Sequence, residues 1–489
     1  MAEPSPPPQT EAALSAAKWP LVGVYLTILM GTLDMSIVNV SLPTLVESLQ
    51  TSFAAVQWVV VSYVLTMTTM LLTVARLGDM HGTKKIFIAG QVVFTLASLA
   101  CGLAPSAHLL IAFRAVQGLG ASMTQALGVA IVAEAVPRAK FGRAVGLIGA
   151  TVSIGLSAGP TVGGLLIGLA GWRSIFLVNL PLGLLAIACL ARYRPPAAEH
   201  RGRQRFDLAG AGLLFLTLCA YCLGMTHGQL EGFGSGFTLG LLAAALVGLG
   251  AFIAVESRVR QPMIDLALFA NPLFSLNLLM GFLVFVANAG AFIMPFYLQL
   301  AKGLSAQDVG LMMMTVPGSM GLIAPLAGHL SDRYGSRILS VVGLVLVIAG
   351  ALAVSTLTAA TPWWGFVLRA APFGLGLGFF QPPNNAAIMA EAPGRHRGVA
   401  SGLLNLSRTF GQTTGLPLAA ALFAARAASL SHLPGRPEVT DLSAEVIAAS
   451  LGHVYLVLSG VVCLATVLAV AALIVDRRRG ALDRPGPLG

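Results

Sequence analysis

The sequence has little charge for its length. Only 10% of its 489 residues are Asp, Glu, Lys or Arg, whereas 56% are hydrophobic, and the mean hydropathy is +0.84. So few charged side chains cannot cover a water-soluble core, which excludes a soluble globular protein. The net charge of +10 does not indicate nucleic-acid binding, because the basic residues lie between apolar runs instead of on one folded face. The composition predicts an all-α polytopic membrane protein.

Cysteine is also scarce. The five cysteines lie inside apolar runs, so neither a disulfide framework nor a metal site is predicted: Cys101, Cys189, Cys219, Cys222 and Cys463. The Cys-x-x-Cys pair in this set is compatible with redox chemistry or half a zinc site, but no second pair or nearby His accompanies it. Small apolar packing is therefore the preferred interpretation.

A phosphate-binding loop is missing. The sequence contains no Gly-x-x-x-x-Gly-Lys-Ser/Thr, and Gly374, Gly376 and Gly378 lie within an apolar run instead of a strand-to-helix turn. ATP hydrolysis is therefore excluded. The energy source is expected to be an ion gradient, with the proton gradient preferred, or the substrate's own gradient, and no cofactor is expected.

One charged, glycine-containing turn is present twice. Leu77, Asp79 and Gly82 return 253 residues later as Leu330, Asp332 and Gly335. Asp and Gly suit a tight turn between helices, and nearby Lys and Arg suit the cytoplasmic surface. The repetition predicts two related halves with a gating role for these turns, carried by Asp79, Gly82, Lys84, Asp332, Arg333, Gly335 and Arg337.

Apolar runs of membrane-spanning length predict fourteen helices. They cover residues 20–43, 55–77, 85–104, 107–135, 143–170, 174–192, 207–227, 236–256, 272–300, 305–330, 337–358, 363–391, 397–425 and 451–476. An even number of crossings places both termini on one side. Of the 29 Lys and Arg residues, 22 then fall on that side and three within helices, leaving four outside: Arg173, Lys302, Arg426 and Arg436. This asymmetry predicts that both termini are cytoplasmic.

The repeat divides the predicted helices into domains. Residues 19–195 and 272–480 are expected to form two six-helix bundles, separated by residues 196–271. That segment contains a basic loop, an inserted two-helix hairpin and an amphipathic linker. Residues 1–18 are expected to be a disordered cytoplasmic tail and 481–489 a second cytoplasmic tail, with no cleavable signal. Two six-helix halves that rock about a midplane site are a transporter architecture.

Asp34 and Arg114 are the candidates for proton coupling. Asp34 lies roughly 21 Å into the first helix, where a carboxylate costs on the order of 2.5–3.5 kcal/mol unless it is paired, hydrated or protonated. Arg114 enters from the outside to about 10 Å, a depth that allows the two to meet. The alternatives are a purely structural ion pair for Asp34 and bonding to helix-end carbonyls for Arg114.

The fifth predicted helix is rich in glycine. Glycines four residues apart let another helix approach closely, and a proline frees a carbonyl and bends the helix. We expect a seam that seals and reopens between the halves, with ordinary small-residue packing as the alternative. The residues of this predicted gate are Gly155, Gly159, Pro160, Gly163 and Gly164.

Several amides and one more arginine are expected at the substrate cavity. Pro382 and Pro383 predict a break in the twelfth helix, and unpaired amides near it are costly in lipid, so they should face the cavity. The expected substrate-binding residues are Asn39, Gln125, Gln381, Asn384, Asn385 and Arg408. Arg408 lies about 16 Å deep, either as the partner of a cavity acid or as a structural donor to carbonyls.

With these residues identified, the chain resembles the major facilitator superfamily, and within it the fourteen-helix drug:proton antiporters. The matching patterns are Leu33-Asp34-x-x-Ile37-Val38-Asn39, Gln57-Trp58-Val59, the turns 75–85 and 328–337, Arg114-x-x-Gln117-Gly118-x-Gly120-Ala121, Gly155–Gly164 and Gly171–Pro181. Ala75 stands where the family's first turn usually begins with Gly, and Met80 stands where it usually has Arg. A cytoplasmic lock that uses this arginine is therefore in doubt in the first half. Arg333 retains the arginine of the second turn.

The resemblance implies a secondary transporter, not an enzyme, in the plasma membrane. Its expected action is multidrug efflux, with lipophilic, cationic or otherwise amphipathic compounds exported in exchange for protons; anionic substrates stay possible. Asp34 is the implied proton carrier. The alternatives are an exporter of one endogenous metabolite or lipid and, more remotely, a non-transporting receptor or scaffold. The expected partners are membrane lipids, a small lipophilic substrate and protons, with no nucleic acid and a monomeric chain.

Overall fold

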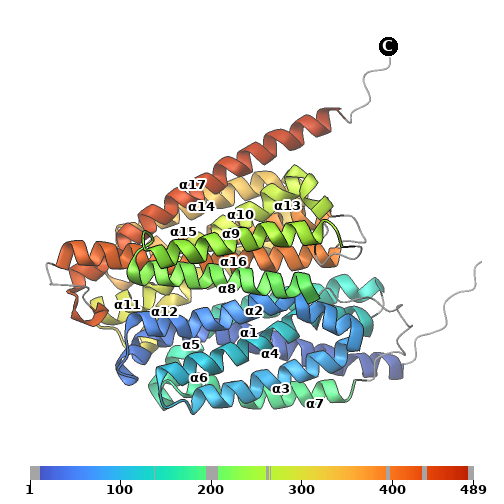
Figure 1. The fold of residues 1–489 in the computed structure, drawn as a ribbon, viewed down its shortest axis with the longest axis horizontal. Helices are drawn as coiled ribbons and strands as arrows, with labels where there is room; N and C mark the ends of the chain where they lie inside the picture. Colours follow the sequence, from blue (N-terminus) through green and yellow to red (C-terminus); the bar gives the residue numbers. More distant parts are fainter. Residues whose placement is uncertain are drawn as a thin grey trace, which may run out of the picture.

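The fold is helical throughout the part of the chain that can be described. A computed structural model describes residues 11–136, 138–193, 208–259, 264, 266–392, 397–431 and 438–482, and every regular element in these ranges is a helix (Figure 1). The predicted all-α class is therefore correct.

The helices follow the chain in three groups. The first group is α1 (Glu11–Ser48), α2 (Phe53–His81), α3 (Thr83–Gly102), α4 (Ala107–Ala135), α5 (Arg138–Ala170), α6 (Ser174–Leu177) and α7 (Asn179–Ala191). The second is the pair α8 (Leu208–Glu231) and α9 (Gly236–Glu256). The third is η1 (Leu266–Ala270), α10 (Pro272–Asn288), η2 (Ala289–Phe292), α11 (Met294–Phe296), η3 (Tyr297–Ala301), α12 (Ala306–Met313), α13 (Thr315–Tyr334), α14 (Ser336–Ser355), α15 (Trp363–Glu391), α16 (Arg397–Ser431), η5 (Val439–Asp441) and α17 (Ala444–Leu482).

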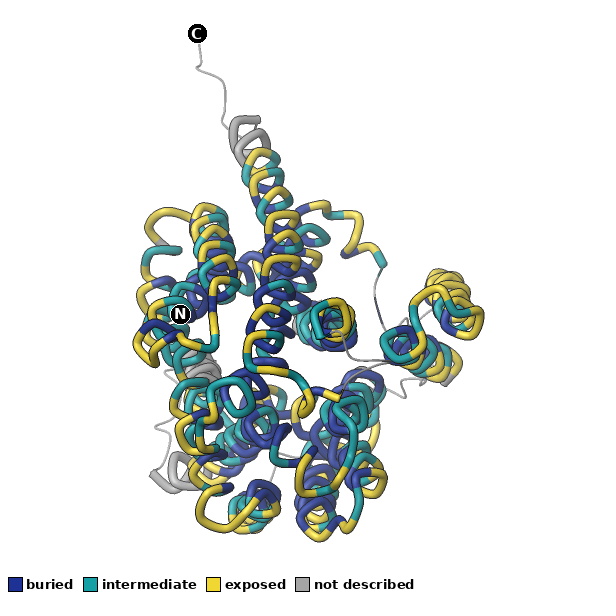
Figure 2. The backbone as a smooth tube through the Cα atoms, turned by 90° about the vertical axis from the view of Figure 1, so that its left-hand side faces the viewer, coloured by how far each residue is buried: buried dark blue, intermediate teal, exposed yellow. Residues whose placement is uncertain are grey.

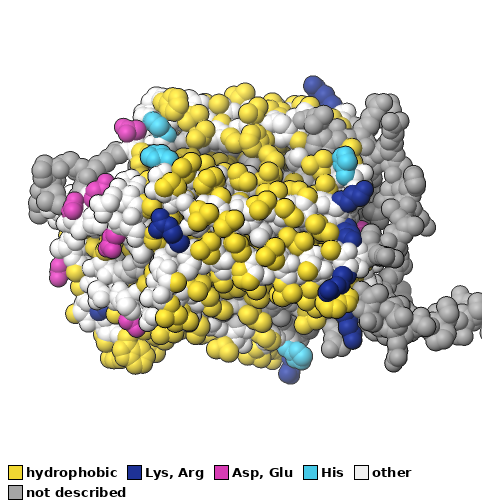
Figure 3. Space-filling view, turned by 90° about the horizontal axis from the view of Figure 1, so that it is seen from below, with side chains coloured by type: hydrophobic (Ala, Val, Ile, Leu, Met, Phe, Trp, Pro, Cys, Tyr) yellow, Lys and Arg dark blue, Asp and Glu magenta, His cyan; other side chains and the backbone are white. Residues whose placement is uncertain are grey.

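The protein is an integral membrane protein. Within the described residues, twelve helical segments are long and apolar enough to cross a membrane, and a shorter apolar stretch of α5 adds Ile154–Ala170. Figure 3 shows hydrophobic side chains as a broad belt, with Asp and Glu gathered toward one end and Lys and Arg toward the other. The basic end holds the Gly82 and Gly335 turns, and we call it the terminal end. We call the acidic end the opposite end.

The two repeated turns have the same backbone geometry. Gly82 separates α2 from α3 with φ of +95°, and Gly335 separates α13 from α14 with φ of +88°. Residues with a Cβ rarely adopt this region, so glycine lets each helix end and the next begin without a longer loop. The sequence repeat therefore corresponds to a structural repeat.

Some predicted helices differ from those observed. The run 272–300 is divided into α10, η2, α11 and the π-helix η3, and 305–330 into α12 and α13. Pro295 has no backbone N–H to continue a regular α-helix, which contributes to the first division. The predicted break at Pro382 and Pro383 is wrong, because α15 continues through both prolines. Neighbouring helices and side chains can satisfy the carbonyls that a proline frees.

The ends of the chain also differ from expectation. Helix α1 begins at Glu11 and so includes part of the tail predicted over 1–18. Its first residues are rich in alanine, which favours helix even where the apolar pattern is weak. Helix α17 extends to Leu482. Residues 1–10, most of the predicted basic loop (194–207), parts of the linker (260–263 and 265) and residues 483–489 lie outside the described ranges.

The first and third groups form two packed halves, with α8 and α9 beside them. Buried positions lie between the helices and exposed positions on their outer faces (Figure 2). Helix α8 packs against α9, against α2 of the first half and against α16 of the second. Tyr221 on α8 hydrogen-bonds Thr414 of α16 at 2.8 Å, and its ring packs 4.7 Å from that of Phe410.

The two halves are packed together at the opposite end. Phe53 at the start of α2 meets two rings of the second half edge-on, Phe292 at 5.5 Å and Phe296 at 4.8 Å, and lies 6.3 Å from Phe423. We call these four residues the aromatic cluster. Such edge-to-face contacts add about 0.5–1.5 kcal/mol beyond the area they bury. Gln299 also donates to the Val40 carbonyl at 3.3 Å.

Candidate functional site

A fully buried ion pair lies inside the first half. Asp34 of α1 has no exposed surface and Arg114 of α4 is 1% exposed, and their Oδ2 and Nη1 atoms are 2.6 Å apart. The proximity expected from their depths is present. Neither side chain faces lipid, where an unpaired charge would be costly.

Amides from two further positions complete the carboxylate's surroundings. Gln117 Nε2 and Asn179 Nδ2 both donate to Asp34 Oδ1, at 2.9 and 2.8 Å. The Gln117 amide also donates to Ser98 Oγ on α3 at 2.8 Å and accepts from Arg114 Nη1 at 2.6 Å. The carboxylate thus has one charged and two neutral donors, the arrangement that makes a buried charge tolerable.

Arg114 is fixed independently of the acid. Its Nε donates to the Val59 carbonyl of α2 at 3.1 Å. Its guanidinium lies 4.1 Å from the centre of the Tyr63 ring and 5.9 Å from that of Phe176. The pairing with Asp34 expected from the sequence is present, and the alternative that Arg114 bonds only helix-end carbonyls is wrong, because its one backbone acceptor, Val59, lies within α2.

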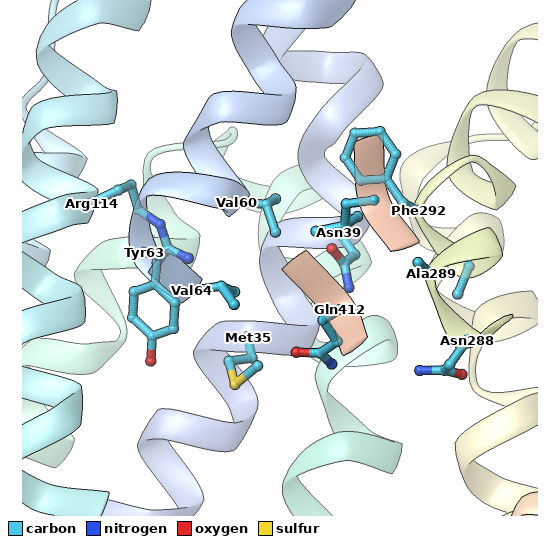
Figure 4. A pocket seen from close by; sticks show the side chains of 12 residues that line it. Met35, Asn39, Val60, Tyr63, Val64, Arg114, Asn288, Ala289, Phe292 and Gln412 are labelled. Atoms are coloured by element: carbon cyan, nitrogen blue, oxygen red, sulfur yellow. The ribbon is translucent and has the colours of Figure 1, made fainter. Parts of the chain in front are cut away.

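The ion pair borders a cavity of about 80 Å³ between the two halves. Figure 4 shows Arg114 and Tyr63 on one side of it, Asn288 on the other, and Asn39 and Gln412 between them. Most of the remaining lining is apolar: Met35, Val60, Val64, Ala289, Ala291, Phe292 and Leu416. The apolar lining with a few amides and a nearby charge is the composition of a small-molecule site, but about 80 Å³ is smaller than the roughly 300–1,000 Å³ of such sites, so the cavity must widen to admit a drug-sized compound.

The structure distributes the predicted substrate-binding residues unequally. Asn39 lines the cavity. Gln381 is half-buried beside Met320, and Gln125 is exposed and does not line the cavity. Asn384 is 1% exposed and turns to α10, where it donates to the Asn277 carbonyl at 3.3 Å, so the expectation that both adjacent amides face the cavity is wrong for this residue. Asn385 instead accepts from Arg408 at 2.8 Å.

The predicted glycine gate contacts two different helices. Side chains at Gly155, Gly159 and Gly163 would meet Thr32, Ser36 and Ile37 of α1, within the same half. Only Gly164 and Pro160 contact the second half, where they meet the backbone of α12 at Ala306 and Gly310. Gly155, Gly159 and Gly163 share the face that meets α1, because residues four apart lie on one helix face. The expected seam between the halves is formed by other positions of the motif, where Ser157 also donates to the Pro317 carbonyl of α13 at 3.0 Å.

The repeated turns hold helix ends through their basic residues. Lys84 donates to the carbonyls of Ala191, at 3.3 Å, and Tyr193 at the end of α7. Burial and nearby Glu134 raise the pKa of Tyr193 to about 12. In the second half Arg337, the counterpart of Lys84, bonds Glu391 of α15 at 2.8 Å and Asp476 of α17 at 2.9 Å.

The remaining charged residues of the turns are described only in part. Arg333 is exposed and lies 5.4 Å from the ring centre of Tyr334. The side chains of Asp79 and Asp332 lie outside what the structure describes, although the backbone of each is helical.

Sequence reasoning did not select several residues of the site. Gln117 and Asn179 lie in recognised patterns, but nothing there indicates that both donate to one carboxylate oxygen. Ser98 has no sequence signal. Asn288 is an isolated polar residue in an apolar run, which is the signal that would have selected it, whereas Gln412 lies in a polar stretch with Thr413 and Thr414 and has no such signal.

Comparison with known proteins agrees with this geometry. The family model described as Major Facilitator Superfamily matches residues 24–416 and 278–487. The multidrug resistance protein Stp of Mycobacterium tuberculosis is 35% identical over 83% of this chain and 75% of its own length. The tetracenomycin C resistance and export protein of Streptomyces glaucescens is 33% identical over 87% and 79%. The riboflavin transporter RibZ of Clostridioides difficile is 32% identical over 83% and 88%.

The fold is similar to that of a solved transporter. The inward-facing, occupied structure of a bacterial homologue of the human lysosomal transporter Spinster aligns with a TM-score of 0.69 at 17% identity. The alignment covers 96% of this chain and 98% of that one.

Proposed function

Because the chain belongs to the Major Facilitator Superfamily, we propose that it exports lipophilic, amphipathic compounds across the plasma membrane in exchange for protons. The chain alternates access to the cavity between its halves. Relatives that carry the names of multidrug and antibiotic resistance proteins support export over uptake. Because Arg114 already neutralises Asp34, the cavity lining offers a cation no unpaired carboxylate, and the proposal gives cations no preference.

The observation that carries the proposal is the Asp34–Arg114 pair at the cavity wall. Asp34 has no exposed surface, yet its partner Arg114 lines the cavity. Water or substrate that enters the cavity can therefore reach the guanidinium and change its hold on the carboxylate. A carboxylate that loses its partner in a dry site takes up a proton, because the neutral form costs less desolvation.

We also propose the membrane arrangement. The terminal end faces the cytoplasm, because Lys and Arg are concentrated there. The chain crosses the membrane fourteen times, with α8 and α9 as a hairpin inserted between two six-helix halves, and it acts as a monomer. The aromatic cluster then closes the outside and the cavity is reached from the cytoplasm.

Transport in proteoliposomes tests the coupling. Wild type should accumulate a lipophilic reporter compound without positive charge, such as Nile red, in inverted vesicles when a proton gradient is imposed. Asp34→Asn should abolish this accumulation and retain downhill exchange, because the substrate cavity is intact. Asp308→Asn is the matched control, since that acid lies in the first turn of α12 and accepts from Ser305. Undiminished proton-driven accumulation by Asp34→Asn would overturn the mechanism.

A dedicated exporter of one metabolite is the second candidate, supported by the relative named a riboflavin transporter. A growth-inhibition panel separates the two. A multidrug exporter protects a drug-sensitive host against several unrelated compounds, whereas a dedicated exporter protects against none or one.

A further inference from the structure

A second arginine lies at membrane depth in the other half. Arg408 of α16 is one helical turn from Gln412 and two from Leu416, and both of these line the cavity between the halves. Side chains four residues apart lie on one helix face, one turn or about 5.4 Å apart along the axis. Arg408 therefore continues the cavity-facing stripe of α16 toward the terminal end.

Arg408 differs from Arg114 in its partners. Arg114 has a carboxylate, a backbone carbonyl and an amide oxygen. Arg408 Nη2 donates to the neutral amide oxygen of Asn385 at 2.8 Å, and its guanidinium lies 5.6 Å from the ring centre of Phe285. Among the described residues, no carboxylate is within ion-pair distance of it. A guanidinium has five N–H donors and stays charged, so no described carboxylate compensates the positive charge of this site.

Polar atoms beside Arg408 also lack partners. Asn384 hydrogen-bonds α10 at Asn277, and Ser407 bonds the adjacent Leu278 carbonyl at 2.7 Å, which places all these residues at one level. At that level Asn277 Nδ2 and Asn384 Oδ1 are buried without a hydrogen-bond partner in the described structure. Leaving buried polar atoms unpaired is unfavourable, so a ligand that pairs with them is stabilised there. Within the described structure, this level thus has a charge without an ionic partner, one unpaired donor and one unpaired acceptor.

We propose that Arg408 and Asn385 form a subsite for an anionic oxygen group, such as a carboxylate, on the transported compound. The apolar body of the compound lies toward Phe285, Met35 and Phe292. The planar fork of a guanidinium matches a carboxylate through two parallel hydrogen bonds, which supplies both charge and orientation. This inference rests on the proposed export function and names its substrate class, amphipathic aromatic acids.

Binding to a matched series tests the subsite without requiring proton coupling. The probes are 1-pyrenebutyrate and its methyl ester, which share the apolar body and differ in charge, and equilibrium binding is measured on full-length protein in nanodiscs. Wild type should bind the acid at least tenfold more tightly than the ester. Arg408→Gln should weaken acid binding by about 10- to 100-fold, the range expected for hydrogen bonds to a charged group, and leave the ester unchanged. The affinity of Arg408→Lys for the acid should lie between those of wild type and Arg408→Gln, because lysine keeps the charge and loses the planar fork of the guanidinium.

The control is Arg369→Gln, which removes an arginine of α15 that donates to Thr356 and to the Gly365 carbonyl. It should leave binding of both probes unchanged. Unchanged ester affinity also verifies that Arg408→Gln is folded. Equal affinities of wild type for acid and ester, no measurable binding of the acid, or an equal loss of both probes in Arg408→Gln overturns the subsite. Failure of proton coupling alone, seen in the Asp34→Asn assay, leaves this binding result standing.

Discussion

At the scale of single residues, the molecule contains two membrane-embedded arginines in opposite situations. Arg114 is neutralised by Asp34 and anchored to Val59, whereas within the described residues the hydrogen-bond partner of Arg408 is the neutral Asn385. The same side chain therefore serves as a fixed counter-ion in one half and as an available charge in the other. From the sequence, both arginines are basic residues at membrane depth, and nothing there shows that their partners differ.

Removing one member of the buried Asp34–Arg114 pair should lower the stability of the folded protein more than removing both. Arg114→Met is expected to destabilise the protein by about 3–5 kcal/mol, because it leaves a buried carboxylate uncompensated. The double variant Asp34→Asn, Arg114→Met should recover part of this loss. Thermal unfolding in one detergent measures all four members of the cycle, and a double variant as unstable as the sum of the singles contradicts the expectation.

At the scale of helices, glycine decides where the two halves approach. Gly164 contacts the Ala306 backbone, and a Cβ at this position would collide with a carbonyl that cannot rotate away. The close α5–α12 approach therefore depends on the absence of a side chain.

A larger residue here should force the halves apart at the opposite end. Gly164→Val is expected to shift the spin-label distance between Ser48→Cys and Ser429→Cys, placed in a cysteine-free background, toward longer values and to lower the transport rate at least tenfold. Gly250→Val in α9 is the control, because a Cβ there meets open space. An unchanged distance distribution in Gly164→Val would show that this approach does not hold the closed end.

Arg337 connects three helices at the terminal end of the molecule through two ion pairs. It is 10% exposed and joins the start of α14 to Glu391 of α15 and Asp476 of α17. Arg337→Gln should lower stability by about 1 kcal/mol, since partly exposed pairs are screened by water. Arg333→Gln should have little effect, because that side chain is exposed. Melting temperatures at low and high salt measure both, and equal shifts in the two variants contradict the difference.

The sequence predicts the helices better than it predicts their faces. Within the described residues, apolar run length identifies twelve of the fourteen predicted spans, and the repeated glycine turns relate the halves, because both depend on local chemistry. The direction in which an amide such as Asn384 points depends on which helix packs beside it. The same is true of Gly155 of α5, whose contact with α1 cannot be read from its own helix. The partners of Asp34 come from helices far apart in the chain, so no spacing rule brings Gln117 and Asn179 to one oxygen atom.

At the scale of the whole molecule, the aromatic cluster closes one end of the cavity. Phe53 of the first half fits against three rings of the second. Phe53→Ala should raise about tenfold the rate at which a membrane-impermeant maleimide reaches Asn39→Cys from the opposite end, measured in a cysteine-free background. Phe237→Ala, at an exposed position of α9, should not change this rate. Labelling that is already fast with Phe53 in place contradicts the closure.

Every group that holds Asp34 belongs to the first half: Arg114, Gln117 and Asn179 bind it directly, and Ser98, Val59 and Tyr63 hold those partners. A rotation of one half as a rigid body leaves all distances inside it unchanged. Swinging the halves against each other therefore cannot by itself pull the carboxylate from the guanidinium. In the proposed proton exchange, release from Asp34 therefore requires a deformation within the first half, or the arrival of water or a ligand at Arg114, so the proposed coupling step is local even though the motion it serves is global.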